Sequence, residues 1–164
     1  MAEDAAANAA MIERFYAAFG RRDHAEMGNC YIGDVRFSDP AFGELHGPEV
    51  RAMWRMLCER GTDLEISFRD VEAHDDRGSA HWAADYTFSA TGRKVHNEID
   101  AGFRFRDGLI AEHDDRFSLW RWSRQALGPT GLLLGWSPIV RSKVNSQARS
   151  NLREYMAGGP HAAV

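Results

Sequence analysis

The period of the hydrophobic pattern changes once along the chain, and this change constrains the fold more than any other feature of the sequence. Over residues 12–58 apolar side chains recur every three or four positions, which predicts helices. From Leu64 onward the pattern alternates with a period of two and predicts four strands, over residues 64–73, 79–90, 94–105 and 109–119. Helices followed by an antiparallel meander indicate an α+β fold in which helices pack on one face of a curved sheet.

The helical half divides into three segments. Apolar residues on one face define the first helix, which ends at Gly20: Ile12, Phe15, Tyr16 and Phe19. Asp23 can cap a short second helix whose inward residues are Met27, Cys30 and Tyr31. After a turn at Gly33-Asp34, the alternation of Val35, Phe37 and Asp39 predicts a strand that ends at Pro40. His46-Gly47-Pro48 then opens a third helix.

In the last third of the chain, the hydrophobic pattern has no clear period before residue 139. Residues 122–138 are interpreted as a glycine-punctuated loop with apolar content, and residues 139–156 as a helix. The organisation expected is therefore a flexible N-terminus over residues 1–10, one domain over residues 11–157 and a flexible tail over residues 158–164.

Composition excludes several classes of function. The 24 acidic residues slightly outnumber the 20 basic ones, so a dedicated nucleic-acid-binding surface is disfavoured. No cysteine and histidine cluster has zinc spacing, and no phosphate loop or nucleotide fingerprint is present in the sequence, so we expect no metal and no cofactor. Cys30 and Cys58 fall on helical apolar stripes and are predicted to be reduced core residues.

The sequence shows neither a signal peptide nor a run of ~20 apolar residues. We therefore expect a cytoplasmic protein without a membrane partner.

Four motifs follow one another along residues 9–120: Phe15-Tyr16-Ala17-Ala18-Phe19, Val35-Arg36-Phe37-Ser38-Asp39-Pro40, His46-Gly47, and Phe103-Arg104-Phe105 followed by Asp107-Gly108-Leu109-Ile110. In this order and spacing they resemble the nuclear transport factor 2-like superfamily, which includes SnoaL-like polyketide cyclases and ketosteroid isomerases. The resemblance implies a cone-shaped barrel, with N-terminal helices on a curved, mainly antiparallel sheet. The helix predicted over residues 139–156 is an addition at the C-terminal end, and we expect a homodimer. Because this fold hosts both enzymes and non-enzymes, function must be argued from the site.

Asp39 is the first candidate catalytic residue. It shares a strand face with Val35 and Phe37, so it is predicted to point into the cone. The resemblance implies a general base at this Asp-Pro motif, and an apolar pocket would raise the pKa of the carboxyl group. The alternative is that Asp39 forms a turn with Pro40 or caps a helix.

His113 and Asp115 are the second candidates. They share one face of the last strand with Phe117, and a carboxylate can orient an imidazole for acid or base chemistry. The alternative is a polar pair that is hydrogen-bonded within the core or faces a dimer interface.

Aromatic residues dominate the predicted cone lining, which suits a small hydrophobic ligand but would equally suit an ordinary core. Asn97 is the polar exception on its strand face, and it could hold a ligand carbonyl or tie neighbouring strands together. The candidate ligand-binding residues are Phe15, Tyr16, Phe19, Trp54, Trp82, Tyr86, Phe88, Asn97, Ala101, Phe103, Phe117 and Trp120.

Some positions depart from the family pattern. Phe15 and Ala101 stand where the resemblance implies a tyrosine and an aspartate that form the oxyanion hole of the isomerases. Tyr16 and Asp100 are each displaced by one residue, and Asp100 is predicted to point to the opposite sheet face. Arg104 and Arg116 are predicted to point outward, which speaks against the Asp-Arg-Asp site of epoxide hydrolases.

Three kinds of function stay open at this point. One is a cofactor-independent isomerase, cyclase or dehydratase that acts on a cyclic carbonyl compound. Another is a module that binds a hydrophobic ligand without turnover. The third is an interaction protein whose sheet forms a homodimer interface, with a rim made of Asp85, Arg104, Arg106 and Arg116. The small subunit of an oxygenase, which binds a partner chain, is not excluded either. Residues 121–137 are predicted to be a lid or a dimer contact.

Overall fold

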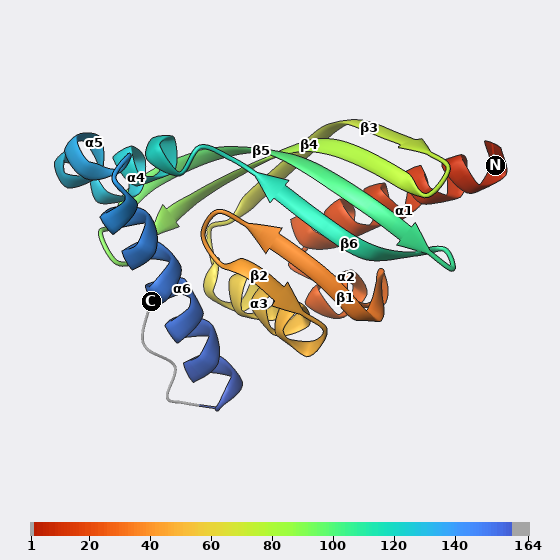
Figure 1. Cartoon of the computed structure of the whole chain (residues 1–164), viewed down its shortest axis with the longest axis horizontal. Coiled ribbons are helices and arrows are strands. Elements are labelled where there is room, and N and C mark those ends of the chain that lie inside the picture. Colours follow the sequence, from red (N-terminus) through yellow and green to blue (C-terminus); the bar gives the residue numbers. More distant parts are fainter. Residues whose placement is uncertain (1, 159–164) are drawn as a thin grey trace.

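A six-stranded sheet organises the chain, which the computed structural model describes over residues 2–158. The strand order is β2-β1-β6-β5-β4-β3, and the sheet is curved but not closed (Figure 1). The strands are β1 (Tyr31–Asp39), β2 (Gly43–His46), β3 (Glu65–His74), β4 (Arg77–Phe88), β5 (Arg93–Arg106) and β6 (Leu109–Arg116). The α+β prediction and the four-strand meander β3-β4-β5-β6 are confirmed.

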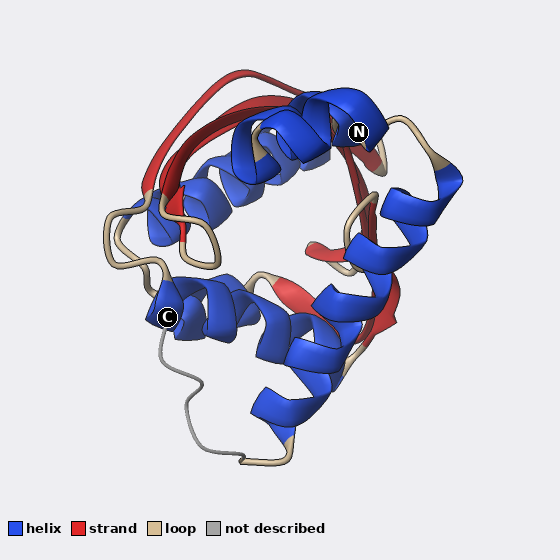
Figure 2. Cartoon of the chain, turned by 90° about the vertical axis from the view of Figure 1, so that its left-hand side faces the viewer, coloured by secondary structure: helices blue, strands red, loops and turns tan. Residues whose placement is uncertain are grey.

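Six helices accompany the sheet within the described residues. They are α1 (Ala2–Gly20), α2 (His24–Asn29), α3 (Pro48–Arg60), α4 (Leu119–Leu127), α5 (Pro129–Leu134) and α6 (Pro138–Met156). Figure 2 shows the strands curving around one side of the molecule while helices close the other. The predicted apolar stripe of α1 is buried throughout, and Cys30 and Cys58 are buried free thiols as expected.

The N-terminal helix begins earlier than the sequence pattern suggested. It starts at Ala2, and Asn8 is buried and donates a hydrogen bond to the carbonyl oxygen of Asp75 at 2.8 Å. Most of the 1–10 segment is therefore part of α1. Of the predicted tail, residues 159–164 lie outside the described residues.

The turn predicted at Gly33-Asp34 is wrong, because β1 runs through both residues from Tyr31. An irregularity in the pairing of β1 with β6, between Tyr31 and Arg36, accommodates this glycine-containing stretch. Short strand β2, which was not predicted, pairs with the end of β1, where Asp39 lies opposite Gly43. The pairing of β1 with β6 is parallel and aligns Phe37 with His113.

The loop predicted over residues 122–138 is also wrong, because α4, α5 and the start of α6 occupy it. Its glycines serve close packing: a Cβ atom at Gly131 would overlap the backbone carbonyl of Ser123 in α4. Gly128, with φ +65°, separates α4 from α5 in a backbone conformation that favours glycine. The glycines that suggested a loop in the sequence thus allow the short helices α4 and α5 to pack in direct contact.

Helix α6 returns along the outside of the domain and fixes the connection that follows Asp39. Asn145 donates a hydrogen bond to the carbonyl oxygen of Ala41 at 2.8 Å, and Arg149 donates to that of Phe42 at 2.9 Å. The hydroxyl of Tyr155 donates to Glu59 of α3 at 2.5 Å. The C-terminal helix therefore supports the β1–β2 turn from outside.

Candidate functional site

A chain of buried polar groups crosses the inside of the cone. The indole Nε1 of Trp54 donates to the hydroxyl of Tyr31 at 2.9 Å, and that hydroxyl lies 2.7 Å from Nδ1 of His113. Nε2 of His113 lies 3.0 Å from Oδ1 of Asp115, which also accepts from Nε1 of Trp82 at 3.2 Å. Four elements, α3, β1, β6 and β4, contribute to this chain, so tertiary packing assembles it.

The direction of each hydrogen bond in this chain follows from its ends. Both indole nitrogens can only donate, so the Tyr31 hydroxyl accepts from Trp54 and is free to donate to Nδ1 of His113. Nε2 of His113 then carries the hydrogen and donates to Asp115. In this assignment both ring nitrogens of His113 have a hydrogen-bond partner, and Oδ1 of Asp115 accepts two hydrogen bonds.

His113 is the centre of an aromatic cluster and has no exposed surface. Its ring centroid lies 4.4 Å from that of Phe103 and 5.2 Å from that of Phe37, and it stacks on Trp54 at 5.9 Å. The ring therefore cannot reach a ligand without repacking the core. Its arrangement suits a residue that positions Asp115.

Asp115 offers one oxygen for further chemistry. Its Oδ2 forms no hydrogen bond with any residue in the described part of the chain, whereas Oδ1 accepts from both His113 and Trp82. Near it, the hydroxyl of Tyr16 is fully buried and has no partner within residues 2–158. Burial, and secondarily the negative charge of Asp115, hold the pKa of Tyr16 well above its usual value, so the phenol stays a hydrogen-bond donor.

Asp39 lies at the end of β1 and combines a turn-forming role with a perturbed acidity. Its Oδ1 accepts a hydrogen bond from the backbone N–H of Phe42 at 2.5 Å, which matches the turn alternative. Even so, burial raises the pKa of Asp39 to about 7, and the charge of Asp115 adds to this increase. Backbone N–H groups of residues 41–43 oppose the shift but do not cancel it. Near neutral pH this carboxyl group can therefore both accept and release a proton.

Tyr86 and Asn97 extend the polar lining beyond Asp39. Burial and, to a smaller degree, the charge of Asp39 raise the pKa of Tyr86, whose hydroxyl accepts from Nε1 of Trp122 at 2.7 Å. The side chain of Asn97 is half-buried and forms no hydrogen bond with any residue that the structure describes. It is thus an amide whose donors and acceptor are free.

The remaining predicted lining residues divide into two groups. Phe15, Tyr16, Phe19, Trp54, Trp82, Ala101 and Phe103 are buried and largely pack against one another, as a core would. Tyr86, Phe88, Asn97, Phe117 and Trp120 are partly exposed. Asp100 is exposed on the outer face and contacts His81 at 2.9 Å, so it does not enter the cone. Arg104 and Arg116 are exposed as predicted.

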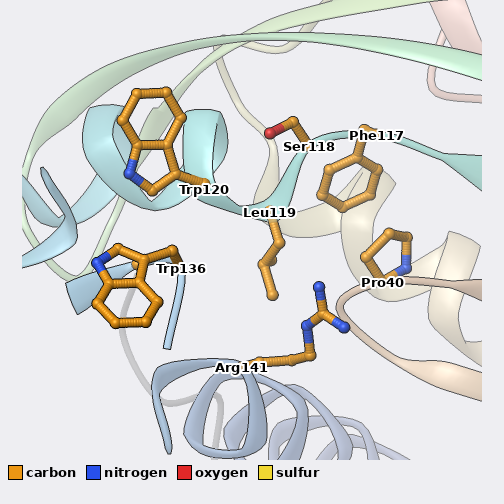
Figure 3. A pocket seen from close by; sticks show the side chains of 8 residues that line it. Pro40, Phe117, Ser118, Leu119, Trp120, Trp136 and Arg141 are labelled. Atoms are coloured by element: carbon orange, nitrogen blue, oxygen red, sulfur yellow. The ribbon is translucent and has the colours of Figure 1, made fainter. Parts of the chain in front are cut away.

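An open pocket of about 470 Å³ lies immediately beyond Asp39, next to Pro40. Figure 3 shows the indoles of Trp120 and Trp136 on one side of this pocket, and Pro40 with the guanidinium group of Arg141 beside it on the other. Phe117, Ser118, Leu119 and Gly135 complete its lining. Arg141 forms no ion pair with any described residue, so the pocket presents one free cation among apolar walls.

Sequence reasoning missed Arg141 as a lining residue and assigned no site role to Trp136. Neither could be placed because the path of residues 122–138 was not recognised as helical. The only available signal was charge: residues 116–153 contain basic residues but no acidic ones.

Helix α4 covers part of the cone from the side of its wide end. Besides the hydrogen bond from Trp122 to Tyr86, the rings of Trp122 and Phe88 meet edge to face at 5.2 Å. Ser118 caps the helix by accepting from the N–H of Arg121, and Gln125 bonds the backbone of His96 in β5. These contacts resemble those of a lid that rests on the cone lining.

Among residues 2–158, no cluster of three or more His, Cys, Asp or Glu side chains has the arrangement of a metal site. Over the same residues, no helix is both long and apolar enough to span a membrane.

The sequence and the fold both match known proteins. The family model described as SnoaL-like domain matches residues 12–113, while none of the curated proteins matches significantly. Three solved structures are similar in fold. An NTF2-like protein of unknown function from Burkholderia pseudomallei is 22% identical, with a TM-score of 0.65 over 73% of this chain and 97% of that one.

The other two carry functional descriptions. A candidate SnoaL-like polyketide cyclase from Jannaschia is 15% identical, with a TM-score of 0.66 over 76% of this chain and 94% of that one. An LEH-like epoxide hydrolase from M. tuberculosis is 17% identical, with a TM-score of 0.64 over 83% of this chain and 96% of that one. At these identities the similarity establishes a shared fold and leaves the chemistry to be argued from the site.

Proposed function

Because the chain belongs to the SnoaL-like domain family, we propose that it binds a small hydrophobic carbonyl compound and catalyses its isomerisation, cyclisation or dehydration without a cofactor. Asp39 is the general base of this reaction. The proposal is carried by the place of Asp39, which directly precedes the pocket-lining residue Pro40 and interacts with Asp115 of the buried polar chain; burial raises the pKa of its carboxyl group to about 7. A base works best when its pKa lies near the working pH.

The other groups have supporting roles in this mechanism. Asp39 removes a proton from the carbon next to the ligand carbonyl, and the electron pair moves onto the carbonyl oxygen. The free amide of the half-buried Asn97 donates a hydrogen bond to that oxygen and orients the ligand. His113 acts as a positioning residue, since it holds Asp115 and both its nitrogens are occupied.

Asp115 keeps the acidity of Asp39 in the useful range. The two carboxylates interact, and the charge of Asp115 makes Asp39 a stronger base than it would be alone. The aromatic lining supplies the apolar surroundings in which such charge effects are large. A flat cyclic ligand fits a lining of this kind.

The pH dependence of proton exchange tests the assignment. With 2-tetralone, an apolar bicyclic ketone, as a probe in D₂O, we expect the protein to accelerate exchange of the protons next to the carbonyl, measured by NMR. The rate should rise with pH and level off above a midpoint near 7, because only ionised Asp39 accepts a proton. A catalysed rate that is flat between pH 5 and 8, or no catalysed rate at all, would speak against a general base at Asp39.

Ligand binding without turnover is the second candidate function. It is favoured by the hydrogen-bond saturation and complete burial of His113, which remove one of the three predicted catalytic groups from direct contact with a ligand. In that case the probe would change tryptophan fluorescence while its protons exchanged at the background rate.

A cytoplasmic homodimer remains part of the proposal. Arg104, Arg106 and Arg116 are exposed on or near the outer sheet face and could form interfacial ion pairs. We expect light scattering to give a dimer mass, and charge reversal of Arg104 and Arg116 to glutamate to lower it towards that of a monomer. An unchanged mass in this double variant would exclude this sheet face as the interface.

A further inference from the structure

Large exposed apolar side chains gather at one place on the molecule. Among the described residues, five of the seven large hydrophobic side chains with high exposure fall within residues 132–139. We call them the apolar tip: Leu132 (50% exposed), Leu133 (69%), Leu134 (50%), Trp136 (73%) and Ile139 (79%). Single exposed apolar residues need no explanation, but a contiguous group of this kind marks an interaction surface.

The apolar tip forms an end of the molecule. Figure 1 shows α4 and α5 at one end, opposite the N-terminus, with α6 beginning beside them. Two contacts support the tip: Nε1 of Trp136 donates to the carbonyl oxygen of Leu133 at 3.0 Å, and Gly131 packs directly on the backbone of α4. Gly131 thereby joins the segment that carries the tip to α4.

The segment that carries the tip has charges of one sign only. Residues 116–153 contain seven basic residues and no acidic one, which leaves 13 of the 20 basic and all 24 acidic residues to the rest of the chain. Arg121 and Arg124 of α4 and Lys143 of α6 are exposed and form no ion pair with any described residue. The guanidinium group of Arg124 lies over the ring of Trp120, 4.9 Å from its centroid.

We propose that the apolar tip docks on a membrane surface that contains anionic lipids. Leucine, isoleucine and tryptophan side chains would enter the boundary between headgroups and acyl chains, while Arg121, Arg124 and Lys143 contact the lipid phosphates. This revises the expectation of no membrane partner, which rested on the absence of a spanning segment. Docking at the surface requires no such segment.

Charge also argues against a second copy of the chain as the occupant of the tip. In a symmetric dimer the same patch meets itself, so each tip would bring its unpaired cations against those of its partner. Like charges at such short range are unfavourable. An anionic bilayer instead satisfies both the apolar and the cationic parts of the surface.

Vesicle flotation with the full-length protein tests the proposal. We expect binding to vesicles of phosphatidylcholine and phosphatidylglycerol in equal parts, little binding to phosphatidylcholine alone, and release at high salt. The variant Arg121→Gln/Arg124→Gln/Lys143→Gln should bind about a hundredfold more weakly. The variant Leu133→Ser/Ile139→Ser should bind at least roughly tenfold more weakly, since two exposed apolar side chains lose their contact with lipid.

Matched controls separate this surface from exposed residues elsewhere. Met156→Ser removes an exposed apolar side chain, and Arg69→Gln an exposed cation, both outside residues 116–153, and both should leave binding unchanged. The proposal is overturned by absent binding, by equal binding to neutral vesicles, or by wild-type binding of the Leu133→Ser/Ile139→Ser variant. It is also overturned if light scattering shows that this variant dissociates an oligomer, because the tip is then a contact between copies. None of these outcomes depends on whether Asp39 is a base.

Discussion

The Asp39→Asn variant is expected to exchange the protons of 2-tetralone about a hundred to ten thousand times more slowly than the wild-type protein, because it removes the general base. Asparagine has almost the same shape, and its side-chain oxygen can still accept the hydrogen bond from the N–H of Phe42. The turn that follows β1, which α6 supports at Ala41 and Phe42, is therefore retained. The loss would report the chemistry of the carboxylate and not the geometry of the turn.

Asp100→Asn is the matched control for this experiment. It removes a carboxylate that points to the outer face and contacts His81, so exchange should continue at the wild-type rate. An Asp39→Asn variant that exchanges as fast as the wild type would assign the base elsewhere, and Asp115 would be the next residue to replace.

The same variant should be more stable than the wild type above pH 7. The pKa of Asp39 is raised in the folded state, to about 7, relative to an ordinary value of 3.8. The protonated form is thus favoured in the fold, and the stability that Asp39 contributes is present below about pH 4 and lost as the pH rises to 7. Urea unfolding should therefore show that the gain in stability of Asp39→Asn over the wild type is roughly 2 kcal/mol larger at pH 8 than at pH 5. An equal change at both pH values would contradict the raised pKa.

Replacement of His113 by alanine is expected to lower the free energy of unfolding by about 3–5 kcal/mol. The ring has no exposed surface and contacts five aromatic side chains, so its removal leaves a cavity that rigid neighbours cannot fill. It also removes the hydrogen-bond partner of the Tyr31 hydroxyl and a donor to buried Asp115. Both groups would then be buried with fewer partners, which adds to the cost.

Two further variants divide this effect into its parts. His113→Gln provides an amide that can accept from Tyr31 and donate to Asp115, and it should lose less stability than His113→Ala in urea unfolding. His81→Ala removes a histidine on the outer face and should cost less than about 1 kcal/mol. If His113→Ala unfolded within about 1 kcal/mol of the wild type, the buried polar chain would not have the role given to it.

The inner face of the sheet could be predicted from the sequence because strand parity is a local property. Once Val35 and Phe37 point inward, Asp39 must follow, and the same rule carries His113 and Asp115 to the inside of β6. The structure agrees for His113 and Asp115, which are buried, and for Arg104 and Asp100, which are exposed. Strand parity does not show that Asp39 both forms a turn and has a raised pKa, because the turn depends on the backbone at Phe42 and the pKa on burial by distant segments.

Contacts between segments far apart in sequence decided the features of the fold that the hydrophobic periodicity cannot predict. The sequence by itself determined the helix stripes, the meander and the side of the sheet that each polar residue takes, because these depend on neighbours in the chain. Only the tertiary structure decided that β1 lies parallel to β6, so that Tyr31 meets His113, and that Gly131 lets two short helices touch. Strand pairing and close backbone contact depend on residues far apart in sequence, and no local period encodes them.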